Sequence, residues 1–254
     1  MEAVIVTVGT TAIRPELGET RSDHQQLQRR IAAFEKQADG RSAAELRALN
    51  AGALFADVVE AHAEILRLAP EDMLDCLGNL SAEVTSTGFL AAHPQSGFGG
   101  GLDPGRVRIV LLASDTAVGL FCAHVNASLL HEFLVRPACK CGNRFDDFVN
   151  GSTCASVRVR VVPGMEARRL DTIYPPLRDL CQREAAGCER VMFNITGGYK
   201  GAVPAITWLA GGVFGTSAEL FYQHESALAA TRLAFVERRV GGPLEMEEST
   251  WASQ

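Results

Sequence analysis

Four short polar segments combine hydroxyl, amide, carboxylate and small side chains in a pattern suited to an anionic ligand. The third segment, residues 194–200, holds two consecutive glycines, a threonine and a lysine. Glycines let backbone amides approach an anion closely, and the start of a helix favours negative charge. A lysine in the first turn of that helix opposes the helix dipole, which indicates a negatively charged partner. The candidate residues of the four segments are Gly9, Thr10 and Thr11; Ser114, Asp115 and Thr116; Asn194, Thr196, Gly197, Gly198, Tyr199 and Lys200; and His224 and Glu225.

Each segment also has a simpler structural interpretation. Serine, threonine, aspartate and glycine cap helices, and capping explains the first two segments as well as ligand binding does. Lys200 could be a solvated surface lysine, and Asn194 could fix its loop by side-chain hydrogen bonds. His224 and Glu225 could form a general base pair, or could only contact a ligand or cap a helix. These alternatives stay open at the level of the sequence.

The elements that would position these segments alternate between strand and helix. Apolar, β-branched runs of the buried-strand type cover residues 3–8 and 107–113, and a run that alternates with arginines covers residues 157–162. Further strands are expected over residues 189–194 and 218–223, and helical patterns cover residues 117–135, 167–186 and 201–211. This alternation predicts an α/β fold, Rossmann-like, with a mostly parallel sheet and flanking helices. Ligands bind beyond the carboxyl ends of such strands, where all four polar segments fall. We therefore expect one shared pocket.

One domain over residues 1–237 accounts for most of the chain. A helical insertion is expected over about 19–90, after the first strand. Within it, Ser42 and Glu45 form a capping box that starts a long helix running to Pro70. An irregular insertion is expected over about 136–154, and residues 238–254 are predicted to be an acidic tail.

Composition excludes several classes of protein. The 254 residues are 47% hydrophobic and 21% charged, unlike a disordered chain. A net charge of −6 argues against a reader of duplex nucleic acid. The sequence shows neither a signal peptide nor an uninterrupted apolar stretch of about 18 residues, so no membrane partner and a cytoplasmic location are expected.

The cysteines also favour the expected cytoplasmic location. The count is seven, and the thiols are expected to be reduced. Cys139, Cys141 and Cys154 could in principle hold zinc, but one tight pair plus a lone cysteine is a poor match to the usual spacing. The prediction is loop thiols, with no metal and no cofactor.

Four short runs carry a resemblance to a known family. They are Thr7-Val8-Gly9-Thr10, Leu112-Ala113-Ser114-Asp115-Thr116, Asn194-Ile195-Thr196-Gly197-Gly198-Tyr199-Lys200 and Tyr222-Gln223-His224-Glu225. In this order they resemble the CARF domains (CRISPR-associated Rossmann fold) of type III CRISPR systems, in the branch similar to the sensor half of the Csm/Csx-type ribonucleases. The resemblance implies a homodimer that binds a cyclic oligoadenylate, most simply cyclic tetra-adenylate, with the first and third loops contacting ring phosphates and riboses.

Such proteins often carry an effector domain, and the sequence shows none. No histidine has an arginine at the spacing that the HEPN ribonucleases need, and the Rossmann pattern extends from residue 3 to about 235. A stand-alone CARF protein resembles the ring nucleases, which cleave the messenger without metal and leave 2′,3′-cyclic phosphate ends. The resemblance assigns charge stabilisation to Lys200, ribose or phosphate positioning to Thr10 or Thr11, and fixed amide donors to Gly197 and Gly198.

One departure from the ring-nuclease pattern and two competing functions remain. Ring nucleases have a serine where this chain has Thr11, which keeps the hydroxyl and adds a methyl group. The same pocket could serve a non-catalytic sensor that regulates a partner effector. An ordinary nucleotide-binding enzyme with a similar glycine loop is a third, weaker hypothesis.

Overall fold

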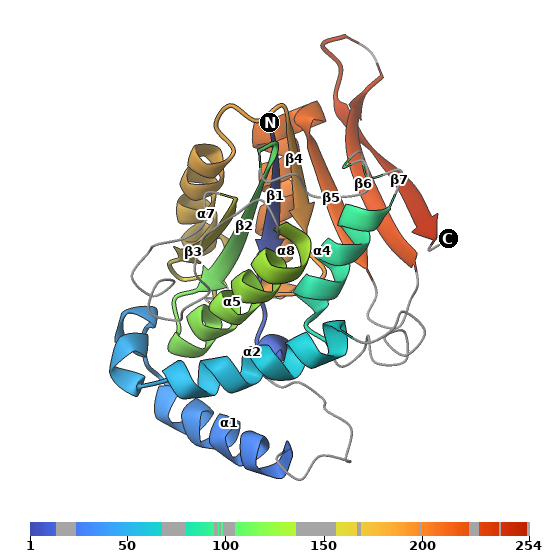
Figure 1. Cartoon of the computed structure of the whole chain (residues 1–254). Coiled ribbons are helices and arrows are strands. Elements are labelled where there is room, and N and C mark those ends of the chain that lie inside the picture. The colour runs from blue at the N-terminus through green and yellow to red at the C-terminus, as the bar shows by residue number, and fades with distance from the viewer. Residues whose placement is uncertain are drawn as a thin grey trace.

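A twisted sheet forms the centre of the protein (Figure 1). The computed structural model describes residues 1–13, 24–67, 80–93, 96, 98, 105–135, 156–166, 169–198, 200–223, 229–238 and 240–252. In these residues the strand order is β3-β2-β1-β4-β5-β6-β7. The strands are β1 (Glu2–Thr7), β2 (Val107–Ser114), β3 (Val157–Val162), β4 (Arg190–Asn194), β5 (Ala218–Gln223), β6 (Ala229–Glu237) and β7 (Leu244–Ala252).

The first five strands are parallel, as predicted. The apolar residues of the central strands β1, β2 and β4 are buried on both faces, which is the environment of a parallel sheet covered by helices, whereas the edge strand β3 is only partly buried. The strand order places β1 in the middle, with β2 on one side and β4 on the other. The α/β, Rossmann-like fold with a mostly parallel sheet is thereby confirmed.

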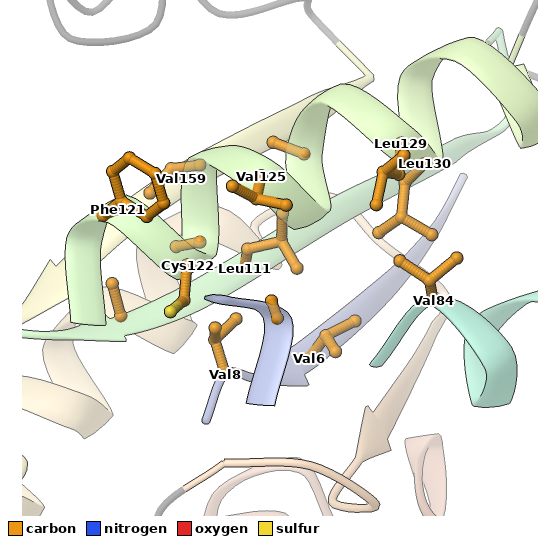
Figure 2. Close-up of a cluster of buried hydrophobic side chains, with 14 of the residues drawn as sticks. Val6, Val8, Val84, Leu111, Phe121, Cys122, Val125, Leu129, Leu130 and Val159 are labelled. Atoms are coloured by element: carbon orange, nitrogen blue, oxygen red, sulfur yellow. The ribbon is translucent and has the colours of Figure 1, made fainter. Parts of the chain in front are cut away.

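Helices cover both faces of the sheet. The core on one face includes residues of α1 (His24–Ala38), α2 (Gly52–Leu66), α4 (Ala82–Ala92) and α5 (Ala117–Leu130). The core on the other face includes residues of α7 (Leu170–Glu184) and α8 (Val203–Leu209). Figure 2 shows part of the first core, in which Val6, Val8, Leu111, Cys122 and Val125 gather between the sheet and α5. Successive residues of β1 thus belong to different cores, as the period of a strand requires.

The segment predicted as one long helix from Ser42 is two elements. The capping box of Ser42 and Glu45 is present, but it starts a 3-10 helix over Ala43–Leu49. Asn50 then adopts a left-handed conformation with φ +48°, which ends that helix before α2 begins. The periodicity continues across the break, so the sequence pattern did not reveal it.

The predicted acidic tail from residue 238 is wrong for the described residues. β6 was not predicted, and β7 pairs with it in antiparallel register from Ala229↔Ala252 to Glu237↔Leu244. Trp251 is buried, and its ring stacks on that of His93 at the end of α4. Acidic residues on β7 suit an edge strand, because charge there discourages pairing with another chain.

Two further expectations concern membranes and metals. One helical stretch, Ala117–Leu134, is long and apolar enough to cross a membrane, but 72% of it is buried inside the protein, as in a core helix. Within the described ranges, no group of His, Cys, Asp and Glu side chains could hold a metal ion. Cys139, Cys141 and Cys154 lie outside those ranges, as does the predicted irregular insertion over 136–154.

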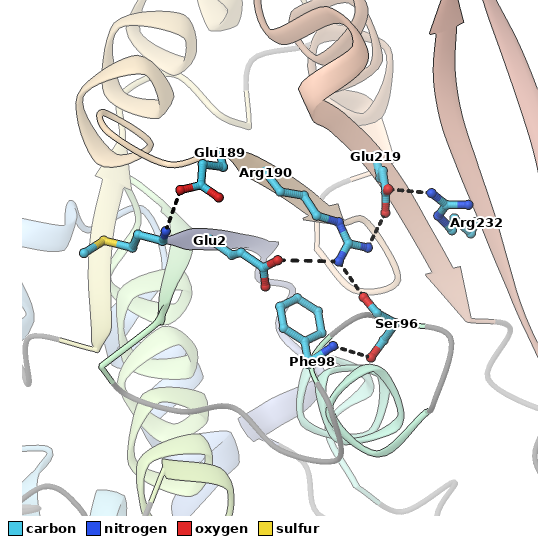
Figure 3. A network of polar contacts seen from close by, with 8 residues as sticks. Glu2, Ser96, Phe98, Glu189, Arg190, Glu219 and Arg232 are labelled. Carbon is cyan, nitrogen blue, oxygen red and sulfur yellow. Dashed lines mark hydrogen bonds and ion pairs between the residues drawn. The ribbon is translucent and has the colours of Figure 1, made fainter.

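An ionic network ties the amino ends of the central strands together (Figure 3). Arg190, the first residue of β4, donates to one carboxylate oxygen of Glu219 at 2.6 Å, and Arg232 of β6 donates to the other. Burial raises the pKa of Glu219, but the hydrogen bonds from Arg232 and Arg190 lower it further, so the net shift is below the usual value. This network lies toward the amino ends of the strands, whereas the predicted pocket lies at their carboxyl ends.

Candidate functional site

The carboxyl ends of β1 and β4 form the point where the sheet changes winding direction. From β1 the chain proceeds through β2 to β3 on one side, and β4 then begins the other side. In open α/β sheets a crevice forms at this point, and ligands bind there. The loop after β1 carries Gly9 and Thr10, and the loop after β4 carries Gly197 and Gly198. Two of the four predicted segments therefore meet at the position where a ligand is expected.

These two loops are in direct contact. The buried hydroxyl of Thr7 donates to the carbonyl of Gly197 at 2.6 Å. Gly198 has φ +89°, and a Cβ there would lie 2.6 Å from the Cβ of Thr7. A Cβ on Gly9 would lie 3.0 Å from the amide nitrogen of Gly198. The glycines therefore allow the two loops to pack together, a role that the sequence analysis did not assign to them.

Asn194 fixes the loop after β4 through its side chain. The residue is fully buried, and its amide nitrogen donates to the hydroxyls of Ser86 at 2.8 Å and Thr87 at 3.1 Å, both on α4. Its side-chain oxygen accepts from the backbone amide of Thr196 at 3.2 Å. The hydroxyl of Thr196 in turn accepts from the backbone amide of Gln223 on β5 at 2.9 Å. The expected loop-fixing contacts of Asn194 are present.

Glu83 is a site residue that the sequence analysis missed. It lies in the first turn of α4, is fully buried, and accepts a hydrogen bond from the backbone amide of Gly9 at 2.6 Å. A Cβ on Gly197 would lie 2.2 Å from the same carboxylate oxygen. The side chain therefore touches both loops. Only the start of a helix marks Glu83 in the sequence, and nothing local indicates the partner loops.

The loop after β2 is braced by its own polar residues. Thr116 caps α5 by accepting from the amide of Gly119 at 3.1 Å, and it also contacts Ser114 at 2.9 Å. The carboxylate of Asp115 accepts from the amide of Gly164, in the loop after β3, at 2.9 Å. Capping and bracing thus account for contacts of all three residues. Whether they also touch a ligand stays a prediction.

The loop after β1 is held from two more helices. The Cys122 thiol of α5 donates to the carbonyl of Thr10 at 3.7 Å, and Nε2 of His62 on α2 lies 2.9 Å from the carbonyl of Ala12. Burial lowers the pKa of His62, which keeps the ring neutral. Burial, with a smaller contribution from Glu83, raises the pKa of Cys122. Since protonated thiols are poor nucleophiles, Cys122 serves as packing and as a weak donor.

Of the residues predicted to act on a ligand, Thr10 and Lys200 are described, and both are exposed. Lys200 begins a 3-10 turn, Lys200–Ala202, that leads into α8. The side chain of Thr11, and the whole of Tyr199, His224 and Glu225, lie outside the described part of the structure.

Comparison with known proteins identifies the family. Residues 79–233, from just before α4 into β6, match the family described as CRISPR-associated protein (Cas_APE2256). A search of the curated proteins finds no match. The matched region is more than half of the chain and includes Glu83, Asn194 and the glycine loop. The chain belongs to the Cas_APE2256 family of CRISPR-associated proteins.

Proposed function

We propose that this protein binds a cyclic oligoadenylate, most simply cyclic tetra-adenylate, across a homodimer and cleaves it without metal or cofactor. Membership of a CRISPR-associated family suggests a role in CRISPR defence, and cleavage of the messenger would switch type III signalling off. The proposal places the protein in the cytoplasm, acting on the free ring and on neither duplex nucleic acid nor a membrane.

The interlocked loops at the β1/β4 crevice carry this proposal. Thr7 and Asn194 hold them in one arrangement through hydrogen bonds of their side chains. Just beyond the glycine loop, Lys200 is exposed, and no described acidic side chain is its ion-pair partner. A rigid loop pair with an available cation suits an anionic phosphodiester, because fixed groups stabilise developing charge without reorganising.

The nucleophile belongs to the substrate itself, so the protein has to position the reacting groups and need not supply a nucleophile. A ribose 2′-oxygen attacks the adjacent phosphorus, the bond from phosphorus to the 5′-oxygen breaks, and the proton lost by the 2′-hydroxyl is balanced by one gained at the 5′-oxygen. The products are linear, with 2′,3′-cyclic phosphate ends. Lys200 stabilises the charge of the phosphorane, and Thr10 or Thr11 positions the ribose or phosphate. The rate rests on holding the in-line geometry.

A non-catalytic sensor is the second candidate, and two observations favour it. The amide of Gly9 donates to Glu83, which leaves fewer backbone donors to stabilise the charge that develops on a phosphate during cleavage. The chain between α1 and the 3-10 helix also pairs with the loop after β2, through the amide of Ala43 to the carbonyl of Asp115 and the amide of Ala117 to the carbonyl of Arg41. Such a contact could pass a ligand-driven change to the helical insertion.

Lys200→Ala separates the two candidates. For the enzyme, this variant loses turnover, while binding of the ring, measured by equilibrium dialysis, weakens less. For the sensor, the wild type binds the ring and returns it intact. Lys36→Ala, which removes an exposed lysine from α1, is the matched control. Undiminished turnover in Lys200→Ala would overturn the assigned role of Lys200.

A further inference from the structure

Glu83 places a fully buried carboxylate between the loops that follow β1 and β4. Ser81 caps α4, and its hydroxyl donates to one carboxylate oxygen of Glu83 at 2.7 Å. The other oxygen accepts from the amide of Gly9 at 2.6 Å. Among the described residues, no arginine, lysine or histidine pairs with this carboxylate. A fully buried carboxylate held only by neutral donors is costly, so its hydrogen bonds must be well made.

The same side chain sets the distance between the two loops. A Cβ on Gly197 would lie 2.2 Å from Oε1, 2.4 Å from Cδ and 2.7 Å from Cγ of Glu83. The outer half of the Glu83 side chain therefore occupies the volume that any other residue at 197 would need. Gly9 is held by hydrogen bonding and Gly197 by packing, so a single residue fixes one loop against the other.

A buried chain of hydrogen bonds through Ser81 and Asn126 supports Glu83. The oxygen of Ser81 also lies 2.6 Å from Oδ1 of Asn126 on α5, and a hydroxyl has one proton to give. Ser81 cannot donate to both Glu83 and Asn126. If the amide of Asn126 is turned, its nitrogen donates to Ser81, and Ser81 donates to Glu83. Asn126 is fully buried, and in the unturned orientation its nitrogen has no hydrogen-bond partner among the described residues, which favours the turned amide.

We propose that Glu83 is a positioning residue of the crevice: its carboxylate locks the Gly9 amide and its side chain fills the space over Gly197, which fixes the geometry of the loops that hold the ligand. The inference rests on the proposed function for its catalytic consequence. Glu83 is not a catalytic residue, because its burial keeps it from touching the ring. This role depends on the length of the side chain and on the positions of its hydrogen-bonding atoms. It does not depend on the negative charge.

Three substitutions test this. Glu83→Gln keeps the length, accepts from Gly9 and donates to Ser81, so it retains the wild-type kcat. Glu83→Asp keeps the charge but is one methylene too short to hold Gly9 and cover Gly197 together. Glu83→Ala removes both contacts. Since a displacement of about 1 Å can cost on the order of 100-fold in rate, kcat falls by about that factor in the Asp and Ala variants, with a smaller change in KM. Glu60→Gln, an exposed carboxylate on α2, is the control.

Hydrogen–deuterium exchange supplies a readout that does not need turnover. The Gly9 amide is protected in the wild type and in Glu83→Gln, and exchanges faster in Glu83→Asp and Glu83→Ala. If the wild type leaves every ring intact, the proposed enzyme fails, but the exchange result still decides the role of Glu83. Gly9 protection that is unchanged in Glu83→Ala would overturn the inference, as would a kcat that follows charge, with Asp active and Gln inactive.

Discussion

Replacing Gly198 with alanine tests the claim that its role is to let the two loops interlock. Gly198 has φ +89°, a region that residues with a Cβ rarely adopt. The added Cβ would meet Cβ of Thr7 at 2.6 Å, its Oγ1 at 2.8 Å and its backbone carbonyl carbon at 2.9 Å. The last of these atoms belongs to the end of β1, so a side-chain rotation cannot relieve the contact.

The cost has two parts. Forcing alanine into a left-handed conformation costs about 1–2 kcal/mol. Overpacking against a fixed neighbour costs about 1–3 kcal/mol more. The sum, about 2–5 kcal/mol, is a large share of the ~5–15 kcal/mol that stabilises a typical domain. A protein of this size loses roughly 2–4 °C in Tm per kcal/mol, so we expect a decrease of about 4–20 °C.

The matched control is Gly187→Ala. Gly187 has φ +76° and no atom within 4 Å of an added Cβ, so it carries the conformational cost alone. The free energy of unfolding of both variants is measured by urea titration with circular dichroism. Gly198→Ala must be destabilised more than Gly187→Ala by the overpacking term. Equal losses in the two variants would refute the claim that β1 and the glycine loop interlock.

Three further predictions concern stability. Asn194→Ala removes the buried amide that donates to the hydroxyls of Ser86 and Thr87, and it leaves the backbone amide of Thr196 without its acceptor, so we expect a loss of about 1–3 kcal/mol in urea unfolding; a smaller loss would show that the loop is held by other contacts. Glu219 has a pKa below its unfolded value, so its stabilising effect is present above an unfolded pKa of about 4.3 and is lost as pH falls through the folded pKa. Unfolding free energy should fall in that range for the wild type and fall less in Glu219→Gln; identical pH profiles would contradict this. Trp251→Ala should cost about 3–5 kcal/mol by thermal melting, against little for the exposed Met246→Ala; equal effects would mean that β7 adds nothing to the core.

The fold was predictable where local pattern decides it. Strands buried on both faces, such as β1 and β2, are continuous apolar runs, and the edge strand β3 alternates valine with arginine, so β1 to β5 could be placed from the sequence within one or two residues. β7 could not, because its acidic residues are exposed and only Trp251 is buried. β7 is a strand because it pairs with β6. Since most of its side chains are exposed, its own sequence carries no periodic burial pattern that would indicate a strand.

The candidate site divides in the same way. Asn194 and Thr196 could be assigned to a structured loop because polar residues after a buried strand are informative by themselves. Glu83 could not, since its meaning comes from Gly9 and Gly197, which are far from it in the sequence. The glycines were interpreted as room for a phosphate, whereas the structure fills that room with Glu83 and Thr7. Interlocking glycines and ligand-approaching glycines have the same sequence signature.

Incubation of the purified protein with cyclic tetra-adenylate and, separately, cyclic hexa-adenylate, in EDTA, tests the central claim most directly. Products are resolved by liquid chromatography with mass detection, and Lys200→Ala is run in parallel. We expect linear oligoadenylates with 2′,3′-cyclic phosphate ends from the wild type and none from the variant. Rings recovered intact from the wild type, whether bound to the protein or free, would contradict it.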